Sequence, residues 1–288
     1  MRLIESKVEL LTQESGLQGI YKQIELAGRT CYKSENNITG NSAKEFVERM
    51  IKSGHTSMLE HGTVYLAVPY SEWDEVGDYF MSYPSNPYSK CDESEVEDFT
   101  SKEGTIYITT NLRVLVENDW LDDLKFLCEP TKVHERRISL KFTTDRGVSH
   151  ELVRHRTFSF AQESTRYCNY NKNKFGNQLT FVMPNWYNSH KYDSYKMNEF
   201  DKTLSNAEEL YMFYIQCGMS PQEARQVLPN ALKTEIVMTG FISDWKHFFD
   251  LRYFGTTGMP HPDMLELTSK AKDILTDQGL WDIMTNKH

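Results

Sequence analysis

The sequence has few of the features that mark disulfide-rich, metal-binding or membrane proteins. It contains 5 cysteines in 288 residues, and none of them forms a C-x-x-C pair. This odd, scattered set predicts reduced thiols rather than a disulfide framework or a zinc ribbon. No apolar run approaches the roughly 18 residues that cross a bilayer, and the first residues alternate apolar and charged positions, unlike a signal peptide. We therefore expect a cytoplasmic protein that is neither exported nor anchored to a membrane.

An excess of positive charge is also missing. The chain has 32 Lys and Arg against 41 Asp and Glu, a formal net charge of −9. An acidic protein has no overall attraction for a phosphate backbone, so we do not expect a nucleic-acid partner. A small anionic ligand would have to be held by a local cluster of cations, which makes the positions of the arginines informative.

The elements expected from the sequence indicate an α+β protein. No repeat or linker-like stretch divides the chain, so residues 1–288 are predicted to form a single domain. Capping residues, prolines and glycines predict five helices. Two begin with a capping box: Ser42–Lys52, with Ser42 and Glu45, and Ser205–Cys217, with Ser205 and Glu208. The others run from Pro221 to before Pro229 with Ser220 as N-cap, from Ser243 to Leu251 with Ser243 as cap, and from Pro262 to about Asp277.

Strands are expected at three places, and one segment is expected to be irregular. Apolar or alternating runs predict strands at Val64–Val68, Thr105–Thr109 and Ile138–Thr143. The acidic stretch from Ser71 to Asp98, rich in Ser, Pro and Tyr, is expected to be an irregular excursion. Helices near both ends with a few strands between them predict an α+β fold with helices around a small mixed or antiparallel sheet.

The densest chemical signal is a cluster of cations between residues 149 and 170. Arg154, His155, Arg156 and Arg166 lie within 13 residues, and their mutual repulsion needs an anion or carboxylates to offset it. The planar guanidinium suits phosphate groups and the carbonyl edge of a base, and the hydroxyls within the cluster could complete a phosphate cradle. The alternative is a solvated basic face paired with neighbouring glutamates, and residue types alone do not decide between the two.

The order of these residues resembles the signature of flavin-dependent thymidylate synthases. Arg154-His155-Arg156 is followed by seven residues, then Ser164, then Arg166-Tyr167. Upstream, GHTSMLEH at 54–61 resembles the family's Gly-His-x-(Ser/Thr)-x-x-Glu-His element; downstream, EARQVLP at 223–229 is similar to its Ala-Arg-x-x-Leu-Pro helix and is followed by Leu251-Arg252. Because the three motifs keep the family's order, the resemblance extends from about residue 27 to residue 261.

The resemblance implies an activity and an assembly. Members of this family methylate dUMP to dTMP reductively, with FAD as cofactor, NADPH as reductant and methylenetetrahydrofolate as carbon donor. They fold as an α+β domain and assemble as homotetramers whose active sites are built from several chains. Relative to compact members, this chain has a long insertion at about 70–140. The alternative is a nucleotide-binding relative without turnover.

The resemblance also assigns roles to residues. Arg252 matches the catalytic arginine that interacts with the pyrimidine and favours ionisation at N3, which makes C5 more nucleophilic. The residues implied to bind dUMP are Glu151, Arg154, Gln162, Glu163, Ser164, Thr165, Arg166 and Arg225. The residues implied to contact FAD are Cys31, His55, Ser57, Glu60, Arg154, His155, Arg156 and His247. No metal site is expected, because the spacing of His55, Glu60 and His61 differs from H-E-x-x-H.

Several positions depart from the family pattern. Cys31 stands where the family has a flavin-contacting serine, and Gln162 where it has a glutamate; the asparagine and arginine flavin contacts near the C-terminus are replaced around Phe241, Ser243 and His247. His261, between Pro260 and Pro262, resembles the family's late flavin histidine in its place along the chain, but its local spacing differs, so a flavin contact is left open. These departures leave the nucleotide site better supported than the adenine end of the flavin site.

Two residues of the motif invite a nucleophile assignment. Ser164 has no base nearby in the sequence, and since a hydroxyl is a weak nucleophile unless activated, ligand binding is the favoured role. Cys168 has no neighbouring His or Lys and is expected to be a buried spectator.

Overall fold

The computed structural model describes residues 1–70, 82–93, 104–187, 189 and 192–286. Its strands are β1 Arg2–Ile4, β2 Lys7–Leu11, β3 Thr63–Pro69, β4 Lys90–Glu93, β5 Thr105–Asn111, β6 Arg137–Asp145, β7 Ser159–Gln162, β8 Thr180–Val182 and β9 Lys233–Phe241. Its α-helices are α1 Gly16–Tyr32, α2 Ser42–Lys52, α5 Ser82–Ser85, α6 Leu112–Glu117, α7 Arg146–Leu152, α8 Ser194–Gln216, α9 Pro221–Ala224, α10 Ile242–Arg252, α11 Pro262–Asp277 and α12 Leu280–Asn286. Short 3₁₀ helices are η1 Glu35–Asn37, η2 Thr56–His61, η3 Leu121–Phe126, η4 Asn173–Phe175 and η5 Arg225–Val227.

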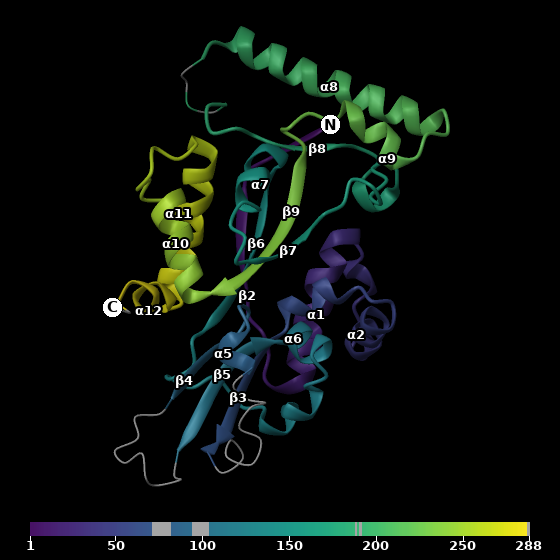
Figure 1. Cartoon of the computed structure of the whole chain (residues 1–288). Helices are drawn as coiled ribbons and strands as arrows, with labels where there is room; N and C mark the ends of the chain where they lie inside the picture. Colours follow the sequence, from purple (N-terminus) through teal and green to yellow (C-terminus); the bar gives the residue numbers. More distant parts are fainter. Residues whose placement is uncertain (71–81, 94–103, 188, 190–191, 287–288) are drawn as a thin grey trace.

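The centre of the molecule is an antiparallel four-stranded sheet in the order β2-β6-β9-β7. Helices α10, α11 and α12 lie on one side of it, and α1 and α2 lie on the other (Figure 1). In β6, Ile138, Leu140 and Phe142 enter the core with Trp245 and Phe248 of α10. The intervening positions of β6 are polar, as period-2 alternation requires. The predicted α+β class, with helices around a small antiparallel sheet, is therefore confirmed.

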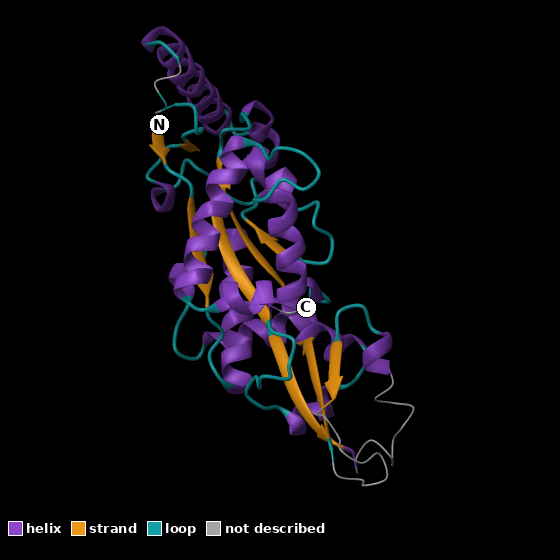
Figure 2. Ribbon diagram, turned by 90° about the vertical axis from the view of Figure 1, so that its left-hand side faces the viewer, coloured by secondary structure: helices purple, strands orange, loops and turns teal. Residues whose placement is uncertain are grey.

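A second sheet, β3-β5-β4, continues from one end of the first and gives the chain an elongated shape (Figure 2). It packs against α1, α2 and α6 through a separate apolar cluster that includes Ile24, Phe46 and Ile108. The prediction of an irregular excursion over 71–98 is wrong for residues 82–85 and 90–93, which form α5 and β4; residues 71–81 and 94–98 lie outside the described residues. β4 was missed because its ladder to β5, not its own short sequence, defines it.

Two predicted helix starts need correction. The bounds of α2 agree with the prediction, but Ser42 is not its cap: its hydroxyl donates to the carboxylate of Glu25 at 2.9 Å. Helix α8 begins at Ser194, so the predicted start at Ser205 is wrong. The carboxylate of Asp193 accepts from the amide of Lys196 at 3.0 Å and caps α8 instead. The internal Ser-x-x-Glu pattern imitated a capping box because this face of the helix is polar.

The remaining helices near the C-terminus follow the sequence more closely. Ser220 caps α9 with Pro221 at its first position, and Pro262 starts α11, as predicted. Helix α10 begins one residue before Ser243, whose amide donates to the carboxylate of Glu135 at 3.0 Å, so Ser243 is inside the helix rather than its cap. In the described part of the chain, no helix has the length and apolarity to cross a membrane.

Candidate functional site

The site is organised around Arg252, the last residue of α10. Its Nη1 lies 2.5 Å from Oε2 of Glu151, and its Nη2 donates to the carbonyl oxygen of Glu151 at 3.2 Å. Its Nε donates to Nε2 of His155 at 3.0 Å. Glu151 belongs to α7 and His155 follows that helix. Three contacts therefore fix the direction of a guanidinium that remains 19% exposed.

His155 is an uncharged acceptor in this arrangement. The ring is buried and packs against Phe248 at 4.9 Å between ring centroids. Burial, and then the charges of Arg252 and His247, lowers the pKa of His155 to about 4. Because Nε2 accepts from Arg252, the single proton of the neutral ring lies on Nδ1. The neutral ring thus orients Arg252 without adding a second positive charge beside it.

The protonation of His155 gives a testable pH dependence. We expect a histidine-selective NMR titration to show an Nδ1–H tautomer at neutral pH and protonation near pH 4, against about 6.5 for the ring in the unfolded chain. Between these pH values only the unfolded state binds the proton. Folding stability therefore falls as the pH drops through this window, by about 1.4 kcal/mol per pH unit for one such group.

Urea unfolding of His155→Gln is the companion measurement. This variant lacks the titrating ring, so its stability is expected to fall less steeply between pH 6.5 and pH 4 than that of the unmodified protein. An Nε2–H tautomer, or a folded-state pKa equal to that in urea, would contradict the assignment.

A cavity of about 290 Å³ is lined in part by α7, the helix that also carries Glu151. It is lined by Arg146 and His150 of α7, by Thr165 and by Arg225, among others. Nη1 of Arg225 donates to Oγ1 of Thr165 at 3.3 Å. Two guanidiniums and a hydroxyl facing one cavity form a suitable environment for a phosphate group. The sequence reasoning missed Arg146 and His150, although their i,i+4 spacing before the motif could have signalled a shared helix face.

The loop that carries the motif serine is held mainly through backbone contacts. The amide of Ser164 donates to the carbonyl oxygen of Cys31 at 2.9 Å, and the Ser164 hydroxyl accepts from the amide of Arg166 at 3.3 Å. The side-chain Nε2 of Gln162 donates to the hydroxyl of Ser149 at 2.9 Å. These contacts leave Ser164 partly exposed. Among the described residues, no side-chain base contacts its hydroxyl, consistent with ligand binding rather than nucleophilic attack.

The cysteines near the site are poor nucleophiles. Cys168 is fully buried, as expected, and burial followed by the charge of Glu163 raises the pKa of its thiol to about 12. Burial also raises the pKa of Cys31 to about 11. Because the thiolate is the reactive form, neither side chain is activated at neutral pH.

Most residues implied to contact FAD lie at the surface of this single chain. The side chains of His55, Ser57, Arg154, Arg156 and His247 are exposed. Within the described ranges, no hydrogen bond or ion pair engages the guanidinium of Arg154 or Arg156.

Two of the remaining predicted site residues have partners of their own. The carboxylate of Glu60 pairs with Arg113 of α6, a partner that the sequence did not suggest. The guanidinium of Arg166 is exposed and lies over the ring of Tyr167 at 5.4 Å.

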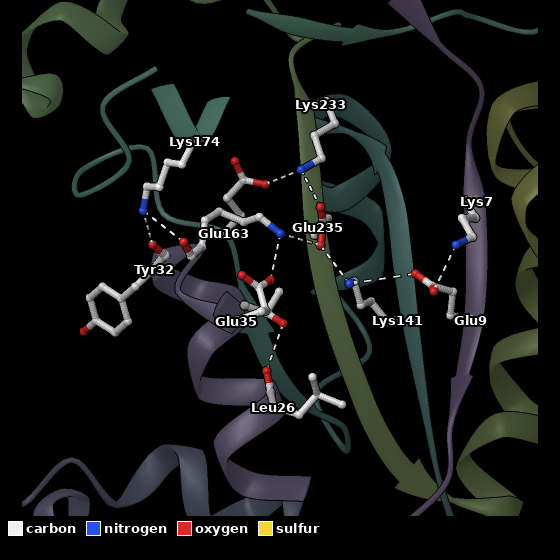
Figure 3. Close-up of polar contacts among 12 residues, drawn as sticks. Lys7, Glu9, Leu26, Tyr32, Glu35, Lys141, Glu163, Lys174, Lys233 and Glu235 are labelled. Carbon is white, nitrogen blue, oxygen red and sulfur yellow. Dashed lines mark hydrogen bonds and ion pairs between the residues drawn. The ribbon is translucent and has the colours of Figure 1, made fainter. Parts of the chain in front are cut away.

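The buried carboxylate of Glu163 belongs to a network of lysines and glutamates (Figure 3). It is 2% exposed, accepts from the hydroxyl of Tyr170 at 3.1 Å and pairs with Lys233 at 2.8 Å. Lys233 also pairs with Glu235 at 2.5 Å, and Glu235 with Lys33 at 2.9 Å. The network joins the motif loop to β9 and to the end of α1. Nothing in the local sequence of the motif indicated these contacts.

Comparison with known proteins agrees with the motifs. Residues 133–257, which contain the whole arginine cluster and Arg252, match the family described as thymidylate synthase complementing protein. The flavin-dependent thymidylate synthase of Pyrococcus furiosus is 36% identical over 107 residues, 37% of this chain and 42% of that protein. The one from Corynebacterium aurimucosum is 31% identical over 142 residues, 46% of this chain and 55% of that protein. The resemblance to flavin-dependent thymidylate synthases is confirmed over this segment.

The sequence matches cover only part of the length of each relative. The chain spans about two fifths of the length of the Pyrococcus relative, at 42%. Among solved structures, a UMP/dUMP methylase PolB from Streptomyces cacaoi, bound with 5-Br dUMP, aligns over 96% of this chain and 93% of its own, with 15% identity and a TM-score of 0.44.

Proposed function

We propose that the protein is an enzyme that methylates dUMP to dTMP reductively, with FAD as cofactor, NADPH as reductant and methylenetetrahydrofolate as carbon donor. The observation that carries this proposal is the guanidinium of Arg252, which Glu151 and a neutral His155 fix in place. Helix α7, which carries Glu151, also lines the cavity of Arg146 and Arg225. The family match over residues 133–257 supports it.

In this proposal Arg252 acts on the pyrimidine. Its guanidinium stays cationic at all relevant pH values and stabilises the negative charge that develops when the uracil ring loses its N3 proton. Electron density at C5 then rises, and C5 forms a bond to the methylene carbon of the donor without a cysteine at C6. The bonds from that carbon to the folate nitrogens break, so that tetrahydrofolate leaves, and the proton on C5 is lost to solvent. Glu151 and His155 hold the guanidinium in place, so little reorganisation is needed as the charge develops.

The phosphate of dUMP is proposed to occupy the cavity of Arg225, Arg146 and Thr165. Ser164 and Arg166 flank Thr165 in the same loop and are proposed to close the site from the solvent side. The buried carboxylate of Glu163 is proposed to support the loop rather than to touch the nucleotide directly, because it is engaged by Lys233 and Tyr170.

The residues present fit an anionic flavin nucleotide. Arg154 and Arg156 present exposed guanidiniums with no partner among the described residues, which suits a pyrophosphate. Bound FAD would supply the hydride that reduces the transferred carbon to a methyl group. Arg154, His155 and Arg156 would hold it, with His55, Ser57, Glu60, Cys31 and His247 as the further contacts that the resemblance implies.

We further propose a homotetramer in the cytoplasm, with each active site shared between chains. The family resemblance supports this assembly. It also gives a reason for the exposure of Arg154, Arg156, His55 and Ser57, since a second copy could cover side chains that lie at the surface of one chain.

The spectrum of the purified protein tests the function. We expect a flavin absorbance that NADPH bleaches under anaerobic conditions, and faster bleaching with dUMP present, because the nucleotide completes the site. A protein that takes up no FAD and does not respond to dUMP would overturn the enzymatic proposal. A protein that binds dUMP but no flavin would indicate a nucleotide-binding relative without turnover, the alternative suggested by Cys31 and Phe241.

A further inference from the structure

A cavity of about 170 Å³ lies at the junction of the two larger sheets, and none of the proposed dUMP and flavin residues lines it. The turn between β2 and α1 forms one wall, and the start of β6 forms the other. Its polar lining includes Gln13, Thr63, Tyr65, Arg136, Arg137 and Ser139. Leu10, Ile20 and Ile138 give it an apolar side.

Arg137 is a partly buried cation that has no carboxylate partner among the described residues. Its Nη1 donates to the carbonyl oxygen of Glu60 at 3.0 Å and to the hydroxyl of Thr63 at 3.4 Å, both neutral acceptors. Its Nε is buried and has no hydrogen-bond partner among the described residues. Burial lowers the pKa of Arg137 to about 10, although the charges of Tyr65 and Glu60 act to raise it. A buried charge left unpaired is costly, and the usual remedy is an anion.

The charged side chains that line the cavity are distributed unevenly between its buried end and its solvent end. Across the described residues, no hydrogen bond or ion pair engages the guanidinium of Arg136. The two acidic lining residues, Glu14 and Glu129, are exposed, and Glu14 pairs with Lys22. The positive charge of Arg137 therefore lies at the buried end of the cavity, and the negative charges lie at its solvent end.

We propose that this cavity binds a small organic anion, a carboxylate or phosphate on a short apolar body, with its charged group on Arg137 and Arg136. The guanidinium fork matches either anion, and the leucine and isoleucine wall accepts the apolar body. Because Arg137 also donates to the carbonyl oxygen of Glu60, ligand binding would affect η2, the element that contains Ser57 and follows His55. The binding proposal itself does not depend on the proposed methylation activity.

Calorimetric titration of the full chain with benzoate, inorganic phosphate and benzyl alcohol tests the proposal. We expect at least one anion to bind and benzyl alcohol, the neutral analogue of benzoate, not to bind. Preference for benzoate would assign a carboxylate ligand, and preference for phosphate a phosphate ligand. Binding of neither anion would overturn the site.

Variants locate the binding and separate it from folding. Arg137→Met is expected to weaken anion binding at least tenfold, yet to unfold at the same or a higher urea concentration without ligand, because it removes an unpaired buried charge. Arg113→Met is the matched control: it also contacts Glu60 but does not line the cavity, so anion binding should persist. Arg136→Gln gives a second test should Arg137→Met not fold. Unchanged anion affinity in both Arg137→Met and Arg136→Gln would contradict the proposal.

Discussion

Replacing Arg252 by lysine is expected to lower the rate of dTMP formation about 10²- to 10³-fold, the loss typical of removing one preorganised donor from a developing anion. Lysine keeps the charge but cannot make the three directed contacts that Arg252 makes with Glu151 and His155. Its ammonium would lie at the end of a flexible chain, displaced from the pyrimidine. The measurement is the initial rate at saturating dUMP.

Flavin content and a distant arginine serve as controls for Arg252→Lys. The variant is expected to retain the flavin absorbance of the unmodified protein, because Arg154 and Arg156 are untouched. Arg49→Lys, at an exposed position of α2, should leave the rate within about twofold, as surface substitutions away from a site usually do. A rate for Arg252→Lys equal to that of Arg49→Lys would show that the guanidinium has no part in the chemistry.

Replacing Lys233 by methionine is expected to lower the free energy of unfolding by about 3–5 kcal/mol, the usual loss when one partner of a buried ion pair is removed. Glu163 would keep only the hydroxyl of Tyr170, and it has almost no exposure to water that could solvate its charge. Glu235 would still pair with Lys33, so Glu163 would be the carboxylate that is left without an ion pair. Urea unfolding at neutral pH measures the loss.

Two further variants test whether the loss comes from the unpaired charge. Lys196→Met removes an exposed pair with Asp193 and should change stability by no more than about 0.5 kcal/mol. Combining Glu163→Leu with Lys233→Met removes both charges and should recover much of the stability. A loss below about 1 kcal/mol in Lys233→Met would mean that water reaches Glu163 and that the network contributes little.

Helices with clear ends were predictable from the sequence, whereas elements defined by tertiary packing were not. Glycine after α2 and Pro262 before α11 fixed those helices locally. Strand β9 was missed because it is buried on both faces, so its sequence KTEIVMTGF shows neither the period-2 alternation of a half-buried strand nor a long apolar run. Helix α1 was missed because of its glycines; Gly28 is needed there, since a Cβ would come within 2.5 Å of the ring of Phe46.

The candidate site was also predictable only in part, because the motifs identified residues but not the contacts between them. The order of motifs identified Arg252 and His155 because the family signature is a sequence pattern. Their contact spans 97 residues of chain, and the contact of Arg252 with Glu151 spans 101, so spacing alone could not predict either. The pairing of Glu163 with Lys233, 70 residues away, was hidden for the same reason. Packing of α7 against the end of α10, not a motif, decides which side chain holds Arg252.

The most direct test of the proposed reaction follows the transferred carbon. The purified protein is incubated with dUMP, NADPH, FAD and methylenetetrahydrofolate labelled in its methylene carbon, and the nucleotides are separated and analysed by mass. The proposal predicts dTMP that carries the label in its methyl group and is absent when dUMP or NADPH is omitted. Unchanged dUMP from a protein shown to hold both FAD and dUMP would contradict it.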